Sequence, residues 1–328
     1  MSTSKKALIT GATGQDGMHL AELLLSLNYD VYGLVNGQRQ ANGEKLAKSY
    51  PDVRQIRGDL TDFGSLTKAL SIVEPDEIYN LGAISFVGMS FRQPEMTANI
   101  TGLGTLRLLE AVRSLGMESQ ARFYQASSSE MFGKVQEVPQ TEKTQFYPRS
   151  PYGVAKVFAH NTCVNYREAY GMHISAGILF NHEGERRGYE FVTRKITSTV
   201  AKIKLGKAKE LRLGTLEPQR DWGYAGDYVK AMQLMLQQEK PDDYVIATGE
   251  THSVGEFAKI AFELAGIPDG IERFVKIDDE FKRPSEVDLL IGDASKAKSQ
   301  LGWEPSVSFQ ELIQLMLEND LKIESESV

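Results

Sequence analysis

The chain has 328 residues, 41% hydrophobic and 25% charged, which excludes disorder and collagen-like repeats and allows one large core or two smaller ones. The formal net charge of −7 argues against general nucleic-acid binding. No window approaches the roughly 18 apolar residues of a membrane-spanning helix, so we expect no membrane segment and a cytoplasmic protein. The single cysteine, Cys163, cannot form an internal disulfide, and the five scattered histidines predict no metal site.

The first 130 residues alternate short apolar runs with helical patterns. Strands are predicted at KALIT (6–10), DVYGLV (30–35), VRQIRGDL (53–60), EIYNLGA (77–83) and RFYQAS (122–127). Helices lie between them, three of which are predicted to begin near Gly14, Phe63 and Pro94. Several strands are apolar on both sides, which is typical of a parallel sheet with helices on both faces. We therefore predict an α/β fold with a doubly wound parallel Rossmann sheet.

The alternation loosens after about residue 180. The following segments read as a polar loop at 181–190, a helix at 191–206, a strand at 242–249 that returns to the sheet, and helices at 253–266 and 308–320. The acidic end ESESV is expected to fray. We predict a NAD(P)-binding domain at 1–180 with a return segment at about 215–250, and a smaller α/β substrate-binding lobe at 181–214 and 251–328.

The segment ALITGATGQDG places Gly11, Gly14 and Gly17 directly after a strand and at the start of a helix. Glycine allows a tight turn there and lets backbone amides approach a pyrophosphate, whose charge the helix N-terminus favours. A plain glycine-rich turn is the alternative. The strand before and the amphipathic HLAELLLSL after the glycines favour dinucleotide binding.

The end of the second strand discriminates the two nicotinamide cofactors, because a carboxylate there binds the ribose 2′-hydroxyl and an arginine accommodates a 2′-phosphate. The segment GLVNGQRQ has Asn36 at this point and Arg39 three residues later, with no carboxylate, which favours NADP and leaves NAD possible. After the third strand, Asp59 either bonds the adenine or caps the next helix, and both interpretations stay open.

A helix is predicted from Pro151 to Tyr170, with Ser150 as its N-cap and Gly171 as its stop. Tyr152 and Lys156 then lie on one face, one turn apart. An ammonium beside a phenol favours the phenolate, and such a tyrosine can take a proton from an alcohol while hydride leaves the same carbon.

Ser128 and Glu130 come just after the strand RFYQAS and point the same way if the chain is still extended there. A serine hydroxyl can share the substrate oxygen with Tyr152. A simple dehydrogenase has no evident use for the carboxylate, so Glu130 is either a solvated or turn-capping group or a catalytic one, and its placement favours catalysis.

At this point the sequence resembles the extended short-chain dehydrogenase/reductase family, through the glycine cradle, GDLTD, NLGAISFV and Tyr-x-x-x-Lys. Within it, nearly the whole chain is similar to the GDP-mannose 4,6-dehydratases. The matching blocks include TGATGQDG, ASSSEMFGKVQEVPQ, FYPRSPYGVAK, NYREAYGM, GILFNHEGERRGYEFVTRKIT, QRDWGYAGDYVKAM, DDYVIATGETHSV and RPSEVDLLIGD.

The resemblance implies that GDP-mannose is dehydrated to GDP-4-dehydro-6-deoxy-D-mannose, with no net use of cofactor, in a dimer or tetramer. Tyr152, Lys156 and Ser128 would remove hydride and a proton at C4 of the hexose, and Glu130 would move the C5 proton so that the C6 hydroxyl leaves as water. The predicted cofactor-binding set is Gly11, Thr13, Gly14, Gln15, Asp16, Gly17, Asn36, Arg39, Asp59, Leu60, Leu81, Ser85, Lys156, His182 and Arg187. The predicted substrate-binding set is Ser85, Ser129, Asn181, Val192, Lys195, Arg220, Arg283 and Glu286.

The chain departs from the family pattern at several positions. Ser128 stands where many members have threonine, and the loop with Asn36 replaces a longer one with paired arginines. Ile84 and Phe86 replace polar residues, and Met96 replaces a tyrosine that contacts the cofactor. A nucleotide-sugar epimerase or 4-keto reductase would need Tyr152 without the carboxylate, and a regulator that senses NADP without turnover would need neither; these remain the alternatives.

Overall fold

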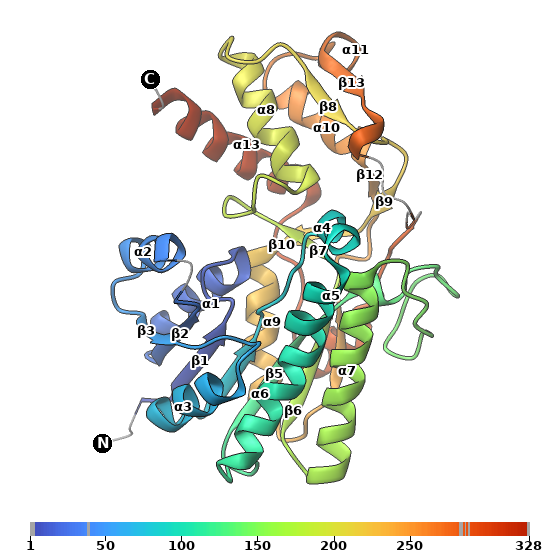
Figure 1. The fold of residues 1–328 in the computed structure, drawn as a ribbon. Helices are drawn as coiled ribbons and strands as arrows, with labels where there is room; N and C mark the ends of the chain where they lie inside the picture. The colour runs from blue at the N-terminus through green and yellow to red at the C-terminus, as the bar shows by residue number, and fades with distance from the viewer. Residues whose placement is uncertain (1–3, 38–39, 282–284, 286, 288, 327–328) are drawn as a thin grey trace.

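The structure is a computed structural model that describes residues 4–37, 40–281, 285, 287 and 289–326. A larger lobe is built around a central sheet, and a smaller lobe of helices and short strands lies above it (Figure 1). The chain starts in the larger lobe and finishes in the smaller one. None of the helices in the described part of the chain is long and apolar enough to cross a membrane.

The central sheet has seven strands, all parallel, in the order β11-β6-β5-β4-β1-β2-β3. Their bounds are β1 Lys6–Thr10, β2 Asp30–Val35, β3 Arg54–Arg57, β4 Glu77–Asn80, β5 Arg122–Ser128, β6 Ile174–Leu179 and β11 Asp243–Ile246. Side chains alternate between the two faces, since Ala7 and Ile9 enter one apolar core and Leu8 the other.

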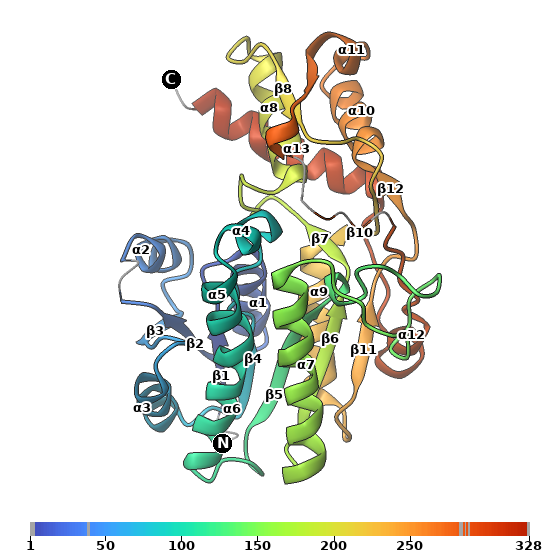
Figure 2. The ribbon, with the colours of Figure 1, turned by 45° about the vertical axis from the view of Figure 1, so that its right-hand side comes forward.

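Helices cover both faces of the sheet (Figures 1 and 2). One core is closed by α1 (Gln15–Ser26), α2 (Gln40–Ser49), α9 (Ala225–Gln237) and α12 (Ser295–Leu301). The other is closed by α3 (Phe63–Val73), α6 (Leu103–Ser114) and α7 (Pro151–Tyr170). The predicted doubly wound Rossmann sheet is therefore confirmed.

Helix α7 begins and ends at the capping residues that the sequence provides. Ser150 has an extended backbone, and its side chain accepts a hydrogen bond from the Gly153 amide. Pro151 occupies the first turn, and Gly171 ends the helix with φ of 67° in the left-handed region. The predicted bounds of this helix are confirmed.

The long helix predicted from Pro94 is confirmed, and it contains a π-helical turn near its start. It follows the separate α4 (Val87–Arg92) and consists of the short α5 (Pro94–Thr97), the π-helical turn at Ala98–Gly102 and then α6. The guanidinium of Arg107 donates to the Asn99 carbonyl at 3.0 Å and to its side-chain oxygen at 2.7 Å. The Arg107 side chain therefore links the π-helical turn to α6.

The smaller lobe packs α8 (Val192–Lys204), α10 (Val254–Leu264) and α13 (Phe309–Glu326) around an apolar core of its own. Strand β8 (Leu211–Leu213) pairs with β13 (Val275–Ile277) beside α11 (Gly270–Phe274). Two small pairings lie nearer the larger lobe, β7 (Asn181–Glu183) with β10 (Trp222–Tyr224) and β9 (Gln219–Arg220) with β12 (His252–Ser253). The boundaries 1–180, 215–250, 181–214 and 251–328 stay a prediction.

The acidic tail is helical through Glu326, so the expected fraying is wrong for the described part of ESESV. Lys207 donates to the Glu324 carbonyl, and Lys202 lies 3.5 Å from the Glu324 carboxylate. Cations of α8 and its following loop therefore hold the last turns of α13 against the lobe.

Candidate active site

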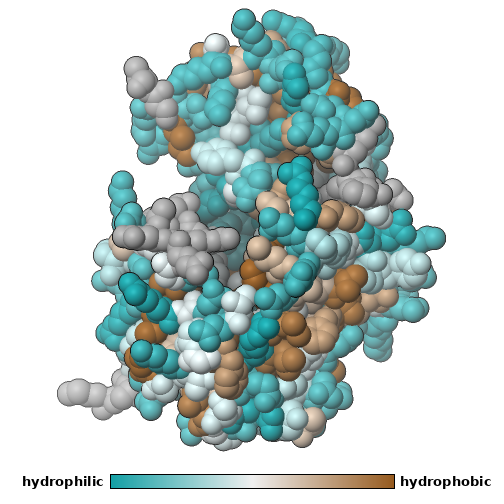
Figure 3. Space-filling model, viewed as in Figure 1, coloured by the Kyte–Doolittle hydropathy of each residue, from teal (hydrophilic) through white to brown (hydrophobic). Residues whose placement is uncertain are grey.

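A cleft of about 1780 Å³ lies where the ends of the parallel strands meet the smaller lobe. Figure 3 shows the surface hollowed between the two lobes. A pocket for one small ligand is usually about 300–1,000 Å³, so this cleft has room for two ligands side by side. Its position outside the carboxyl ends of the strands is the usual binding place in open α/β sheets.

The glycine turn after β1 brings backbone to the floor of the cleft. Gly11 has φ of 69°, and a Cβ atom there would lie 3.0 Å from the Gly82 amide nitrogen. A Cβ at Gly17 would lie 2.4 Å from the Gly11 carbonyl oxygen. Gly14 precedes α1 with no side chain to cap its amides. Backbone donors without a covering side chain, at a helix N-terminus, fit a pyrophosphate group.

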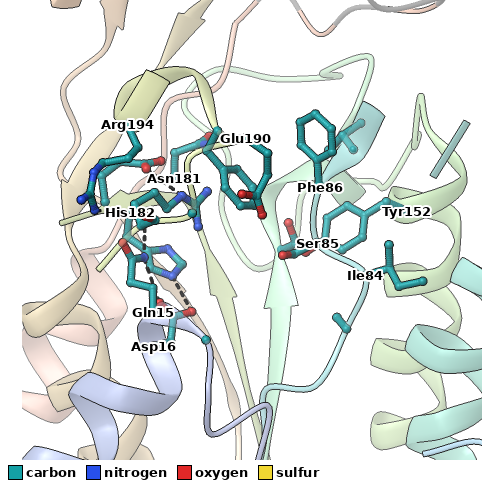
Figure 4. A pocket seen from close by; sticks show the side chains of 18 of the residues that line it. Gln15, Asp16, Ile84, Ser85, Phe86, Tyr152, Asn181, His182, Glu190 and Arg194 are labelled. Carbon is teal, nitrogen blue, oxygen red and sulfur yellow. Dashed lines mark hydrogen bonds and ion pairs between the residues drawn. The ribbon is translucent and has the colours of Figure 1, made fainter. Parts of the chain in front are cut away.

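Gln15 and Asp16 point from the start of α1 toward His182 on β7 (Figure 4). His182 Nε2 lies 2.9 Å from Asp16 Oδ2, and Gln15 donates to the His182 carbonyl at 3.0 Å. Burial alone raises the pKa of Asp16, but the nearby His182 holds this pKa well below its usual range. Burial lowers the pKa of His182, but Asp16 outweighs it and raises this pKa overall. This ion pair joins the nucleotide cradle to the strand that leads into the smaller lobe.

At the other end of the cradle, the Asn36 amide donates to Asp59 Oδ2 at 2.6 Å. Asp59 Oδ1 accepts from both the amide and the hydroxyl of Thr61. The cap of α3 is Asp62, whose side chain accepts from the Gly64 amide, so the helix-capping interpretation of Asp59 is wrong. Arg39 lies outside the described residues.

Tyr152 and Lys156 stand on the first turns of α7, with Ser128 opposite them at the end of β5. Lys156 Nζ donates to the Ala126 carbonyl at 2.6 Å and lies 5.7 Å from the centre of the Tyr152 ring. Burial lowers the pKa of Lys156 to about 8. Burial also raises the pKa of Tyr152, and the hydrogen bond with Ser128 opposes this. The expected lowering of the phenol pKa is therefore not found in the protein alone, because burial outweighs the Ser128 hydrogen bond.

Glu130 lies on a single 3₁₀ turn, Ser129–Met131, directly after β5. The Ser128 hydroxyl accepts from the Glu130 amide at 3.2 Å, which caps this turn. The chain is therefore not extended at Glu130, which was the condition for the two side chains to point the same way. Both side chains nevertheless line the cleft, as Tyr152 does, and Glu130 is 8% exposed. A carboxylate thus lies at the same end of the cleft as the phenol and the serine hydroxyl.

The smaller lobe contributes cations to the cleft. Arg187 lies 2.8 Å from the buried Glu183 and 3.6 Å over the ring of Phe191. Lys195 Nζ lies 3.0 Å from the centre of the Phe281 ring, and burial lowers its pKa. Arg220, which is buried, donates to the Val287 carbonyl at 2.6 Å. Such a cluster can receive a diphosphate in a protein whose net charge is negative.

The structure brings every described residue of the predicted set to this one cleft; Arg39, Arg283 and Glu286 lie outside the described residues. The lining includes Gly11, Thr13, Gly14, Gln15, Asp16, Gly17, Asn36, Asp59, Leu60, Leu81, Ser85, Ser128, Ser129, Glu130, Tyr152, Lys156, Asn181, His182, Arg187, Val192, Lys195 and Arg220. Their individual roles stay predictions. Ile84 and Phe86 also line the cleft, whereas Met96 is 46% exposed on α5 and does not.

Sequence reasoning missed several lining residues that act through packing. Phe191 contacts Phe86 edge to face at 5.8 Å, joining the two lobes across the cleft. Arg194 pairs with Asp320 of α13 at 2.7 Å, with both side chains buried. Arg194 also donates to the Arg187 carbonyl at 3.1 Å, so it fixes the loop that carries Arg187. In the sequence, the one sign of this buried contact was an arginine within the apolar pattern of α8.

The parallel sheet, the cradle after β1 and the tyrosine–lysine helix together define a nucleotide-binding protein of the extended short-chain dehydrogenase/reductase class. Two solved structures share the fold. The UDP-glucose 4-epimerase of Thermotoga maritima with UDP-glucose has a TM-score of 0.85 at 26% identity, over 97% of this chain and 99% of that one. The Thermus thermophilus UDP-glucose 4-epimerase in complex with NAD has a TM-score of 0.83 at 28% identity, over 96% and 98%.

Sequence comparison identifies the family of this chain within that class. The profile of the family described as GDP-mannose 4,6 dehydratase matches residues 8–316. GDP-mannose 4,6 dehydratase 1 of Arabidopsis thaliana is 50% identical over 329 residues, which cover 97% of this chain and 90% of the plant protein. The chain belongs to the GDP-mannose 4,6-dehydratase family.

Proposed function

We propose that this chain dehydrates GDP-mannose to GDP-4-dehydro-6-deoxy-D-mannose in a redox-neutral reaction. The observation that carries the proposal is the buried carboxylate of Glu130 in the same part of the cleft as Tyr152 and Ser128. An epimerase or a reductase needs the tyrosine but has no use for this carboxylate. The family membership and the names of the relatives support the same substrate.

The proposed cofactor is NADP. When bound, a nicotinamide cofactor supplies reversible hydride acceptance, taking hydride from C4 of the hexose and returning it to C6. The turn at Gly11 and Gly17 would hold its pyrophosphate, with the amides at the start of α1 as donors. Asn36 favours NADP over NAD because an amide does not repel a 2′-phosphate as a carboxylate would.

The first proton transfer is assigned to Tyr152. Its phenolate takes the proton of the C4 hydroxyl and becomes the phenol, while the Ser128 hydroxyl holds the same oxygen. Lys156 has a pKa of about 8, so it is largely protonated at neutral pH and its charge favours the phenolate. Both groups are nearly inaccessible to water, which strengthens this electrostatic effect.

The second proton transfer is assigned to Glu130. A ketone at C4 acidifies the hydrogen on C5, and the carboxylate removes that proton. The same carboxyl group then protonates the C6 hydroxyl, which departs as water. The capped turn at Ser129–Met131 fixes the position of Glu130 relative to Ser128 through the 3.2 Å bond from its own amide.

The cations of the smaller lobe would hold the nucleotide diphosphate. Lys195 and Arg220 line the cleft on the side opposite the cradle, with Asn181 and Val192 between the two lobes. A buried guanidinium and a half-buried ammonium lose little further hydration when a phosphate binds, so their charges act at short range.

The test is the Glu130→Gln variant, mixed with GDP-mannose and NADP. The amide cannot take the C5 proton, so dehydrated product should fall by at least about 100-fold. Hydride removal at C4 does not need this carboxylate, so absorbance at 340 nm should rise and persist. Glu239→Gln, in the exposed segment that follows α9, is the matched control and should turn over normally. Normal dehydration by Glu130→Gln would refute the assigned role.

We also propose that the chain is a homo-oligomer, a dimer or a tetramer, that pairs through α6 and α7. Leu103, Val154, Phe158 and Tyr170 are each at least 40% exposed on or beside these helices. In Figure 3, apolar side chains gather over this part of the larger lobe. Light scattering of Phe158→Glu should show a smaller particle than wild type, and an unchanged mass would refute this pairing. The cytoplasmic location stays a prediction.

A further inference from the structure

The end of β3 lies beside the place where the sequence predicts cofactor discrimination. Strand β3 is the edge strand next to β2, and Val35 pairs with Arg57. The amide of Gly58 continues this pairing by donating to the Val35 carbonyl at 3.1 Å. In dinucleotide-binding sheets the adenosine ribose lies at the end of the second strand. Arg57 therefore leaves the sheet beside the ribose position.

The face on which Arg57 lies follows from the alternation along β3. Ile56 packs against the core closed by α3 and α6. Gln55 lies on the other face and donates to the Gly43 carbonyl of α2 at 2.7 Å. Arg57 shares that face with Gln55. A Cβ atom at Gly37 would lie 3.9 Å from Arg57 Cδ, so the arginine runs alongside the loop that follows β2.

The charges around this position favour an anion. Arg57 is exposed, and within the described ranges no carboxylate lies within ion-pair distance of it. The nearest acidic group of the cradle, Asp59, is engaged on both oxygens by Asn36 and Thr61. A guanidinium beside a neutral amide, at a ribose position without a carboxylate, matches the geometry and charge of a phosphate ester.

We propose that Arg57 binds the 2′-phosphate of NADP and thereby sets the cofactor preference of this enzyme. The inference rests on the nicotinamide cofactor of the proposed function and does not depend on the sugar substrate. Gly37 lies beside the arginine stem, at van der Waals distance from it. Asn36 contributes to the same site, since its amide donates to Asp59 and so occupies one oxygen of that carboxylate.

The experiment measures dissociation constants of NADPH and NADH by cofactor fluorescence, with wild type, Arg57→Met and Arg57→Lys. Methionine keeps the aliphatic stem and removes the charge. Wild type should bind NADPH more tightly than NADH. Arg57→Met should weaken NADPH binding by about tenfold or more and change NADH binding by less than about twofold. Arg57→Lys should keep most of the preference.

Arg54→Met is the matched control, because Arg54 lies at the opposite end of β3 and pairs with Tyr32 and Asp30. It should leave both constants unchanged. An unchanged NADPH to NADH ratio in Arg57→Met would overturn the inference, as would tighter NADH binding by wild type. The inference would also be overturned if Arg39→Met lost the preference for NADPH over NADH and Arg57→Met kept it. Arg57-dependent NADPH binding without conversion of GDP-mannose would support the inference and reject the proposed substrate.

Discussion

Replacing Lys156 by methionine should abolish catalysis and also stabilise the cofactor-free protein. Burial lowers the pKa of Lys156 from 10.5 to about 8, so the folded protein holds the charged form at a cost. At about 1.4 kcal/mol for each pKa unit, this difference corresponds to about 3 kcal/mol at neutral pH. Methionine has a similar volume and carries no charge.

The hydrogen-bond partner of Lys156 does not offset this gain. The Ala126 carbonyl, which accepts from Lys156 Nζ, also accepts from the Gln125 side chain at 3.2 Å. It therefore keeps a donor in the variant, and no buried carbonyl is left unpaired. The free energy of unfolding of Lys156→Met should exceed that of wild type by up to about 3 kcal/mol at pH 7.

The pH dependence gives the sharper assay. Between about pH 8 and 10.5 the unfolded chain still binds the lysine proton and the folded protein does not, so wild-type stability rises with pH there. The advantage of the variant should shrink to about 1 kcal/mol by about pH 9.5. Urea unfolding at both pH values measures this, with the exposed Lys68→Met as control. A variant less stable than wild type at pH 7, or an advantage independent of pH, would refute the reasoning.

Three further changes test other parts of the structure. Ser128→Ala removes the proposed hydrogen bond to the reacting oxygen and the cap of the turn that carries Glu130. It should lower turnover by about 10- to 100-fold while the dissociation constant of NADPH stays unchanged; a weakened constant would argue for a cofactor role. Gly17→Ala places a Cβ 2.4 Å from the Gly11 carbonyl, so it should weaken NADPH binding by at least about tenfold in fluorescence titration. Asp320→Asn leaves Arg194 as a buried unpaired cation, and urea unfolding should show a loss of about 3 kcal/mol or more.

The parts of the fold that were predictable depend on local signals. Helix α7 could be bounded to the residue because Ser150, Pro151 and Gly171 act within one turn of each end. Strands β1, β4, β5 and β11 could be found because they are buried on both faces and so read as apolar runs, whereas the equally buried β6 was not predicted. The cradle could be found because a glycine turn between a strand and an amphipathic helix has few other uses.

The parts that were not predictable depend on contacts between distant residues. The π-helical turn before α6 is held by the Arg107 side chain on Asn99, which no periodicity reveals. The 3₁₀ turn at Glu130 depends on the Ser128 hydroxyl bending back to the chain, although the residue types also suit an extended strand. The effect of burial on Tyr152 could not be anticipated from a pattern that shows only the neighbouring Lys156.

The pairing of Arg194 with Asp320 has a consequence for the order in which the molecule can assemble during synthesis. The two residues are 126 positions apart, and the carboxylate is translated last. Until α13 has left the ribosome, α8 carries a guanidinium that its own lobe cannot bury without a partner. The loop with Arg187 can therefore settle only after nearly all of the described chain has been made. The sheet strands β1 to β6 precede it by far, so a growing chain can form the dinucleotide cradle well before it can complete the side of the cleft that the smaller lobe lines.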